Sequence, residues 1–184
     1  MNLNMLQPSG RFRLIQSIAC SAVLLGTVAL SCSVSAAELA RQDKNFLIKA
    51  AQAGKTEVLA SQLAENKATN AEVKSFASTM AQDHAKVGDE LKQLASNKGV
   101  AVPESPARGQ QSEINKLSKL DGDKFDKKYT KDIGLKAHKD AVALFKKASN
   151  DAKDPDIKAF AAKTLPSLEH HLQMAEALKA STDK

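Results

Sequence analysis

Four ionisable side chains fall on or beside apolar stripes of helical sequence: Glu57, His84, His138 and His171. Imidazole groups bind transition metals, and they also form hydrogen bonds with buried carboxylates. An ionised carboxylate that faces a protein core is costly unless a cation or a hydrogen-bond network meets it. The four residues therefore predict either a buried site for a transition-metal ion or a small ligand, or a polar network that only fixes the fold.

Helical periodicity of about 100° per residue places these side chains relative to a core. Glu57 falls in the middle of one stripe of small and apolar residues, and His84 lies at the centre of the next. His138 sits on the shoulder of a third stripe, His171 falls within a fourth, and the neighbouring His170 points away. Counted from the connecting turns, Glu57 and His84 differ in height by about one helical turn, and His138 and His171 are similarly offset. The pattern allows the four side chains to approach one another without requiring one compact shell.

Four long helices are expected to carry these residues. The helical patterns run over residues 41–67, from the residue after Thr69 to about Lys98, from about Asp121–Asp123 to Asn150, and from Pro155 to about Ala180. Thr69 and Glu72 match a capping box at the start of the second helix, and Gly99 ends it. Asp154 and Pro155 supply the N-cap and the first position of the fourth helix.

The lengths of the connections indicate the architecture. The first two helices, and the last two, are joined by only a few residues, so each pair is predicted to form an antiparallel hairpin. The segment between the hairpins contains Pro103, Pro106 and a short helical piece around residues 112–120. Two short connections around one long crossover predict an all-α, ferritin-like four-helix bundle. A simple up-down-up-down bundle is the second choice, because it requires a short central loop.

Residues 1–37 are predicted to be a cleavable signal peptide, which leaves residues 38–184 as the bundle domain. Arg11 and Arg13 precede an apolar, uncharged run from Ile18 to Leu30. Small residues follow this run and favour cleavage after Ala36 or Ala37. An uncleaved anchor is the alternative, although the apolar run is short for a transmembrane span.

Both cysteines of the chain, Cys20 and Cys32, lie within this predicted signal peptide. We therefore expect a mature protein without disulfides or a reactive thiol. Cys32 raises the alternative of a lipoprotein, but Leu30 lies one position too late for a good lipidation motif. The sequence thus favours a periplasmic or otherwise exported protein over one lipidated at Cys32.

The charge of the chain is mildly basic. The sequence has 27 lysines and arginines against 21 acidic residues, and loss of residues 1–37 removes two arginines and no acid. The lysines are spread along all the predicted helices and are not interleaved with aromatic residues, so nucleic acid is not an expected partner. A weak association with the cell envelope or outer membrane is left open, and the sequence sets no oligomeric state.

Four segments resemble an exported bacterial family known as domain of unknown function 4142, in the ferritin-like superfamily. They are FASTMAQDH at 76–84, GKTEV at 54–58, FDKKY at 125–129 and LPSLEHHL at 165–172. The resemblance covers residues 46–178 and implies a ferritin-like bundle, but no reaction, because the family is named for lacking one. By position, the resemblance implies these recurrent polar residues: Glu57, Asp83, His84, Asp126, Tyr129, His138 and His171. Asp83 is expected to orient His84 or to pair with a lysine, Tyr129 to join a buried network with Glu57, and Asp126 to be structural.

The candidate ligands differ from those of di-iron bundles, which carry two Glu-x-x-His pairs and further glutamates. No histidine here has a glutamate three residues before it. One core glutamate and three histidines could hold a single cation, but they do not supply the bridging carboxylates of a di-iron centre. This ligand set suits zinc, copper, nickel or iron better than calcium or magnesium. The chain also lacks Gly-x-Ser-x-Gly, His-Glu-x-x-His and a glycine-rich phosphate loop. Enzymatic activity is therefore left open, with binding favoured over redox catalysis.

The sequence therefore predicts an exported, ferritin-like bundle that binds a metal ion or a small ligand through Glu57, His84, His138 and His171. Metal handling and envelope stress are the roles that this prediction suggests. The alternative is a non-catalytic structural or interaction module of the cell envelope, whose buried glutamate and histidines only fix the fold.

Overall fold

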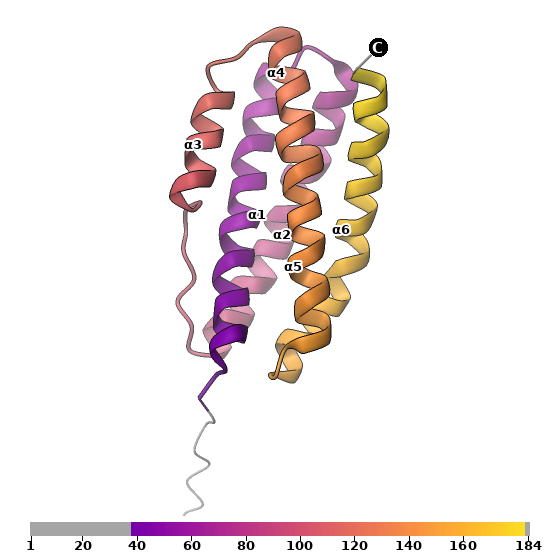
Figure 1. Cartoon of the computed structure of the whole chain (residues 1–184). Coiled ribbons are helices and arrows are strands. Elements are labelled where there is room, and N and C mark those ends of the chain that lie inside the picture. The colour runs from indigo at the N-terminus through magenta and orange to yellow at the C-terminus, as the bar shows by residue number, and fades with distance from the viewer. Residues whose placement is uncertain (1–37, 183–184) are drawn as a thin grey trace, which may run out of the picture. The chain divides into compact units, whose positions relative to one another are not determined.

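Helices make up all the regular structure that the computed structural model gives for the residues it describes, 38–182. The helices are α1 (Arg41–Lys67), α2 (Ala71–Asn97), α3 (Arg108–Leu117), α4 (Gly122–Tyr129), the π-helix η1 (Thr130–Ala137), α5 (His138–Asp151) and α6 (Pro155–Thr182). Because α4, η1 and α5 follow one another without a break, they form one long rod (Figure 1). The predicted signal peptide and its cleavage site lie outside the described residues.

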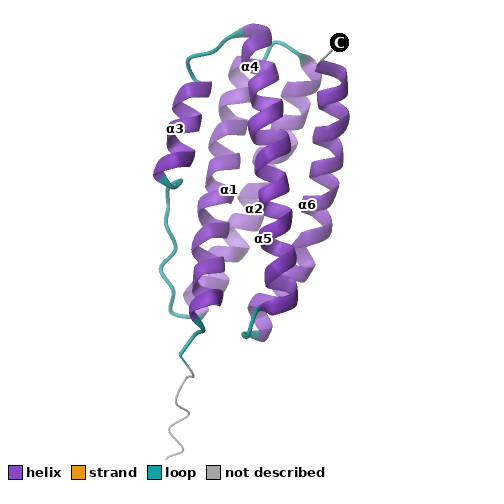
Figure 2. Cartoon of the chain, viewed as in Figure 1, coloured by secondary structure: helices purple, strands orange, loops and turns teal. Residues whose placement is uncertain are grey.

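The arrangement confirms the expected fold class, an all-α, ferritin-like four-helix bundle (Figure 2). Helices α1 and α2 form one antiparallel hairpin, and the α4–η1–α5 rod forms the second with α6. The crossover between them carries α3, which lies beside α1 (Figure 1). No helix within the described part of the chain is long and apolar enough to cross a membrane.

Two helix starts differ from the predicted ones. Asn70, not Thr69, caps α2: its side-chain oxygen accepts the backbone N–H groups of Glu72 and Val73. The short crossover helix begins at Arg108, earlier than expected, where the Gln110 side chain accepts the Ala107 N–H. The predicted start of α6 is confirmed, because Asp154 accepts the N–H groups of the residues at 156 and 157.

Each hairpin loop is held by a buried carboxylate from the other hairpin. Asp126 of α4 accepts hydrogen bonds from the Thr69 N–H and hydroxyl and from the Asn70 N–H, at 2.7 to 3.2 Å. Asp43 of α1 accepts the N–H groups of Lys153 and Asp154 at 2.9 and 2.7 Å. Both carboxylates satisfy loop amides that would otherwise lack partners in the described structure. The expectation that Asp126 is structural agrees with these contacts, whereas no sequence pattern indicated the role of Asp43.

We expect Asp126→Ala to lower the free energy of unfolding by about 2–3 kcal/mol, because it removes the ionised acceptor of three hydrogen bonds. Urea unfolding followed by circular dichroism measures the loss. Asp123→Ala, at an exposed position of the same helix, is the matched control. Equal losses in the two variants would contradict the prediction.

The apolar core divides into two clusters, and a polar layer lies between them along every long helix. One cluster lies toward the α1–α2 loop and includes Phe76, Phe125 and Tyr129. The other lies toward the α5–α6 loop and includes Phe46 and Phe145. In the sequence of each long helix, the residues of one cluster end before the polar residue and those of the other begin after it. The layer holds these four side chains: Glu57, His84, His138 and His171.

Candidate metal centre

The polar layer brings one side chain from each of α1, α2, α5 and α6 to one level. Glu57, His84, His138 and His171 are 2%, 4%, 0% and 3% exposed. The Oε2 atom of Glu57 lies 2.9 Å from Nδ1 of His84, so the offset of one turn expected from the sequence does not separate them. Long side chains lean along the helix axis and close such a gap.

The three imidazoles converge on a common point. The Nε2 atoms of His84 and His138 are 3.2 Å apart. One nitrogen from each of His84, His138 and His171 can be chosen so that all three lie within 4.8 Å of one another. Glu57 is outside this group of converging atoms, because its Oε2 contacts the opposite nitrogen of His84. The structure therefore arranges three histidines around a centre, with the Glu57 carboxylate paired with His84 and its Oε1 3.8 Å from Nδ1 of His138.

In each imidazole, the nitrogen that points away from the common centre contacts a hydrogen-bond acceptor, which fixes the orientation of the ring. His84 Nδ1 faces the Glu57 carboxylate, and His138 Nδ1 lies 3.0 Å from the carbonyl oxygen of Ile133. His171 Nε2 lies 3.0 Å from Oδ2 of Asp83, whose side chain is half exposed. Carbonyl and carboxylate oxygens only accept hydrogen bonds, so each of these three nitrogens carries the hydrogen and donates it.

The opposite nitrogens are therefore the ones left with lone pairs, namely Nε2 of His84, Nε2 of His138 and Nδ1 of His171. Nδ1 of His171 is buried and has no hydrogen-bond partner among the described residues. Two imidazole lone pairs cannot face each other at 3.2 Å without a proton or a cation between them. In the metal-free protein, one of the paired histidines must hold an additional proton.

The electrostatics place that proton on His84. Burial alone would raise the pKa of Glu57, but the neighbouring imidazoles, His84 foremost, lower it. For His84, burial opposes the charged form, and the Glu57 carboxylate outweighs it and raises the pKa. Both shifts favour a Glu57 carboxylate paired with a protonated His84, whose Nε2 then donates a hydrogen bond to Nε2 of His138.

His171 behaves in the opposite way. Burial and the nearby charge of His84 lower the pKa of His171 to about 4, below its ordinary value of 6.5. In the unfolded chain this histidine takes up its proton near pH 6.5, and in the folded protein it does so only near pH 4. The neutral form of His171 therefore contributes fully to the free energy of unfolding above pH 6.5. This contribution is lost as the pH falls from 6.5 to 4, because the unfolded chain takes up the proton first.

We expect the metal-free wild type to lose about 1–3 kcal/mol more stability between pH 6.5 and pH 4 than His171→Gln does. Urea unfolding in the presence of a chelator, at several pH values, measures the difference. His170→Gln, which changes the exposed neighbouring histidine, should keep the wild-type slope. A His171→Gln slope equal to that of the wild type would contradict the prediction.

Two of the predicted polar partners have contacts other than those expected. Asp83 accepts a hydrogen bond from His171, not from His84. Tyr129 is fully buried, but its hydroxyl lies 2.8 Å from Oγ of Ser61, and no hydrogen bond joins it to Glu57 in the described structure. Burial raises the pKa of Tyr129, so its hydroxyl stays neutral. Asp83 therefore supports the layer, and Tyr129 belongs to the apolar cluster beside it.

The carbonyl of Ile133 is a contact that sequence reasoning missed. It lies in η1, which ends at the residue before His138. A π-helical turn departs from the regular i→i−4 hydrogen-bond ladder, and such turns are frequent at functional sites. Gly134 lies in this turn, where an added Cβ would come within 3.4 Å of Ala175 and 3.7 Å of Phe76. This glycine inside a helix pattern was the available sign of irregular backbone.

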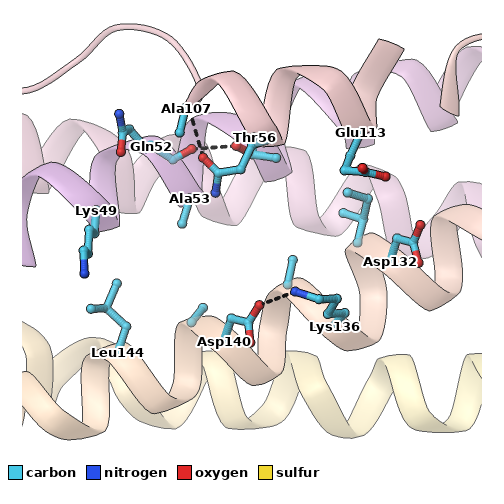
Figure 3. Close-up of a pocket in the computed structure, with 14 residues that line it drawn as sticks. Lys49, Gln52, Ala53, Thr56, Ala107, Glu113, Asp132, Lys136, Asp140 and Leu144 are labelled. Carbon is cyan, nitrogen blue, oxygen red and sulfur yellow. Dashed lines mark hydrogen bonds and ion pairs between the residues drawn. The ribbon is translucent and has the colours of Figure 1, made fainter. Parts of the chain in front are cut away.

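A surface groove of about 760 Å³ lies outside the polar layer, between α1, α3 and the η1–α5 part of the rod (Figure 3). Lys49 and Leu144 stand at one end, and Glu113 and Asp132 stand at the other (Figure 3). None of the four predicted site residues lines the groove. Its charges are of both signs, so they select no single class of ionic ligand.

Comparisons with known proteins agree with this fold. The model of the family described as "Domain of unknown function (DUF4142)" matches residues 30–178. A DUF305 fragment from Deinococcus radiodurans superposes with a TM-score of 0.68 and 14% identity, over 78% of this chain and 98% of that one. A putative secreted DUF305 protein from Streptomyces coelicolor gives 0.65 and 18%, over 77% and 92%.

A third solved structure, CopM in its Cu(II)-bound form, gives a TM-score of 0.61 and 14% identity, over 76% of this chain and 96% of that one. No curated protein matches the chain. At these identities, the three structures establish the bundle fold alone.

Proposed function

We propose that this chain, which belongs to the DUF4142 family, is an exported protein that binds one transition-metal ion inside its bundle. The ligands would be Nε2 of His84, Nε2 of His138 and Nδ1 of His171. The observation that carries the proposal is the convergence of three imidazoles whose other nitrogens are all held by acceptors.

The distances support a shared ion. Two nitrogens that each lie about 2.0–2.1 Å from a tetrahedral metal are about 3.3 Å apart. The observed separation between the Nε2 atoms of His84 and His138 is 3.2 Å. A bound cation would replace the proton between these two nitrogens, and it would also give the unpartnered Nδ1 of His171 a partner.

Glu57 and Asp83 have the positions of partners that orient ligands. A metal-bound histidine commonly donates its second N–H to a carboxylate or a carbonyl, which fixes the ring and raises its basicity. Glu57, the Ile133 carbonyl and Asp83 would each do this for one histidine. We therefore propose that Glu57 acts through His84, in place of the direct ligation that its residue type suggested.

The ligand chemistry favours copper or zinc. Imidazole nitrogen suits zinc, copper, iron and nickel, and copper(II) binds most strongly among the divalent ions of the first row. A structure that shares this fold is described as CopM in its Cu(II)-bound form, which supports copper. The di-iron chemistry of ferritin-type bundles does not fit, because Glu57 is the sole carboxylate among the four residues of the layer.

Export rests on the sequence of residues 1–37, and the described secreted status of one structural relative supports it. The structural alternative retains one specific observation in its favour: Oε2 of Glu57 and Nδ1 of His84 pair at 2.9 Å without any metal. Under that alternative, the layer would only fix the positions of the helices.

Titration of metal-free protein with Cu(II) and with Zn(II), followed by calorimetry and elemental analysis, tests the proposal. We expect one ion per chain in the wild type. His171→Ala should lower the affinity at least about 100-fold by removing a ligand. His170→Ala is the matched control, because the two histidines are adjacent and only His170 is exposed.

Folded protein that takes up neither ion would contradict metal binding and favour the structural alternative. Equal loss of affinity in His170→Ala and His171→Ala would place the ion outside the polar layer.

A further inference from the structure

Two glycines face the same seam of the bundle beside the polar layer. Gly54 on α1 precedes Glu57 by three residues, and Gly88 on α2 follows His84 by four. A Cβ added at either glycine would meet no atom within 4 Å, and neither glycine has a positive φ. Glycine is a poor helix former, so neither packing nor backbone conformation explains its use at these two positions.

The two glycines line two separate spaces. One is a surface hollow of about 190 Å³ on the outer side of the α1–α2 seam. The other is a small, deeper pocket of about 30 Å³ that Glu57 also lines. Ala51, Gly54, His84 and Gly88 line both spaces, so they separate the surface hollow from the deeper pocket beside the polar layer.

Glu57, which lines the deeper pocket, has one carboxylate oxygen without a hydrogen bond in the described part of the chain. Glu57 is 2% exposed, and its Oε1 accepts no hydrogen bond from the described residues. A cavity of about 30 Å³ holds one water molecule or one small ion. A passing cation can bind the carboxylate of Glu57 there, whose Oε1 lies 3.8 Å from Nδ1 of His138, beyond hydrogen-bond distance.

We propose that a divalent transition-metal ion reaches the three histidines by passing between Gly54 and Gly88. We call this route the port. This inference rests on the proposed function. The ion would move from the surface hollow, past the two glycines, into the deeper pocket that Glu57 and His84 line, and then to the three histidines. The crossover covers the hollow from outside through the stretch 102–104, where Glu104 pairs with Lys92 of α2 at 2.6 Å.

The surroundings of the port contain further charges. Lys55 and Asp89 also line the hollow, so its rim carries both signs. A competing approach lies on the α2–α6 side, where the half-exposed Asp83 contacts His171. If the ion enters at the port, side chains introduced at positions 54 and 88 should slow its entry. If the ion enters past Asp83, such side chains should not change the rate.

Stopped-flow mixing of metal-free protein with Zn(II) and with Cu(II) tests the port. We expect Gly88→Val to slow association about tenfold or more and Gly88→Ala to slow it less. Dissociation into excess chelator should slow by the same factor, which leaves the affinity and the stoichiometry unchanged. Gly109→Val, at an exposed helical glycine of α3 that also has free space, is the matched control.

An association rate that is unchanged in Gly88→Val but lower in Asp83→Ala would overturn the port. If the wild type binds neither metal, the proposed function fails. Access of solvent to His84 through the port is then measured without metal. Deuterium exchange at the imidazole C2 of His84, read by mass spectrometry, should be slower in Gly88→Val than in the wild type. Exposed His170 should be unaffected, and equal exchange at His84 in both proteins would overturn the port by itself.

Discussion

Glu57→Ala should lower the free energy of unfolding of the metal-free protein by about 3–5 kcal/mol. The carboxylate is the partner of the His84 imidazolium, and both side chains are almost fully buried. Removal of one member of a buried ion pair leaves the other without compensation, and the shortened side chain also leaves a cavity. Urea unfolding at pH 7 in the presence of a chelator measures the loss.

Glu65→Ala is the matched control for this substitution, because Glu65 lies on an exposed face of the same helix. We expect it to change stability by no more than about 0.5 kcal/mol. The double variant Glu57→Leu with His84→Leu should recover most of the loss, since replacing both partners by apolar groups leaves no unpaired charge. A loss in Glu57→Ala no larger than in the control would show that the pair does not stabilise the bundle.

A saturating concentration of the bound metal should raise the stability of the wild type by about 4 kcal/mol when the ion is present at 1,000 times its Kd. This gain arises because the ion binds the three assembled histidines, which the unfolded chain does not hold together. For a domain of this size, it corresponds to a Tm increase of roughly 8–16 °C. Thermal unfolding with metal and with excess chelator measures the difference.

His138→Leu should abolish this metal-dependent increase while leaving a folded protein. His138 is fully buried, and leucine fills a similar space without a ligand atom. An equal Tm increase in the wild type and in His138→Leu would contradict binding at the histidines, whatever the stoichiometry.

Most of the helical architecture follows from local sequence patterns. Helix α1 has the predicted bounds, and α6 begins at the predicted proline, because apolar periodicity and the Asp154 cap are local features. The periodicity also predicted that Glu57, His84 and His171 face the core, since sequence spacing determines which face of a helix a side chain occupies. The expected fold class is also confirmed, because it follows from the lengths of the helices and of their connections.

The remaining features depend on contacts between distant segments. Asn70 caps α2 in place of Thr69 because Thr69 is engaged by Asp126, which lies 57 residues away. The level of the four layer residues depends on how side chains lean between helices, which counting from the loops does not give. The partner of Asp83 depends on the packing of α6 against α2. The π-helical turn before His138 has no periodic pattern of its own, and only Gly134 pointed to it.

The two carboxylates that hold the loops also bear on how the bundle opens. Asp43 of the first hairpin holds the loop of the second, and Asp126 of the second hairpin holds the loop of the first. Separation of the hairpins therefore exposes both loops at once, and neither half can open while the other keeps all its contacts. In native-state hydrogen exchange, the slowest amides of both hairpins should open together as one cooperative unit, with one common dependence on denaturant.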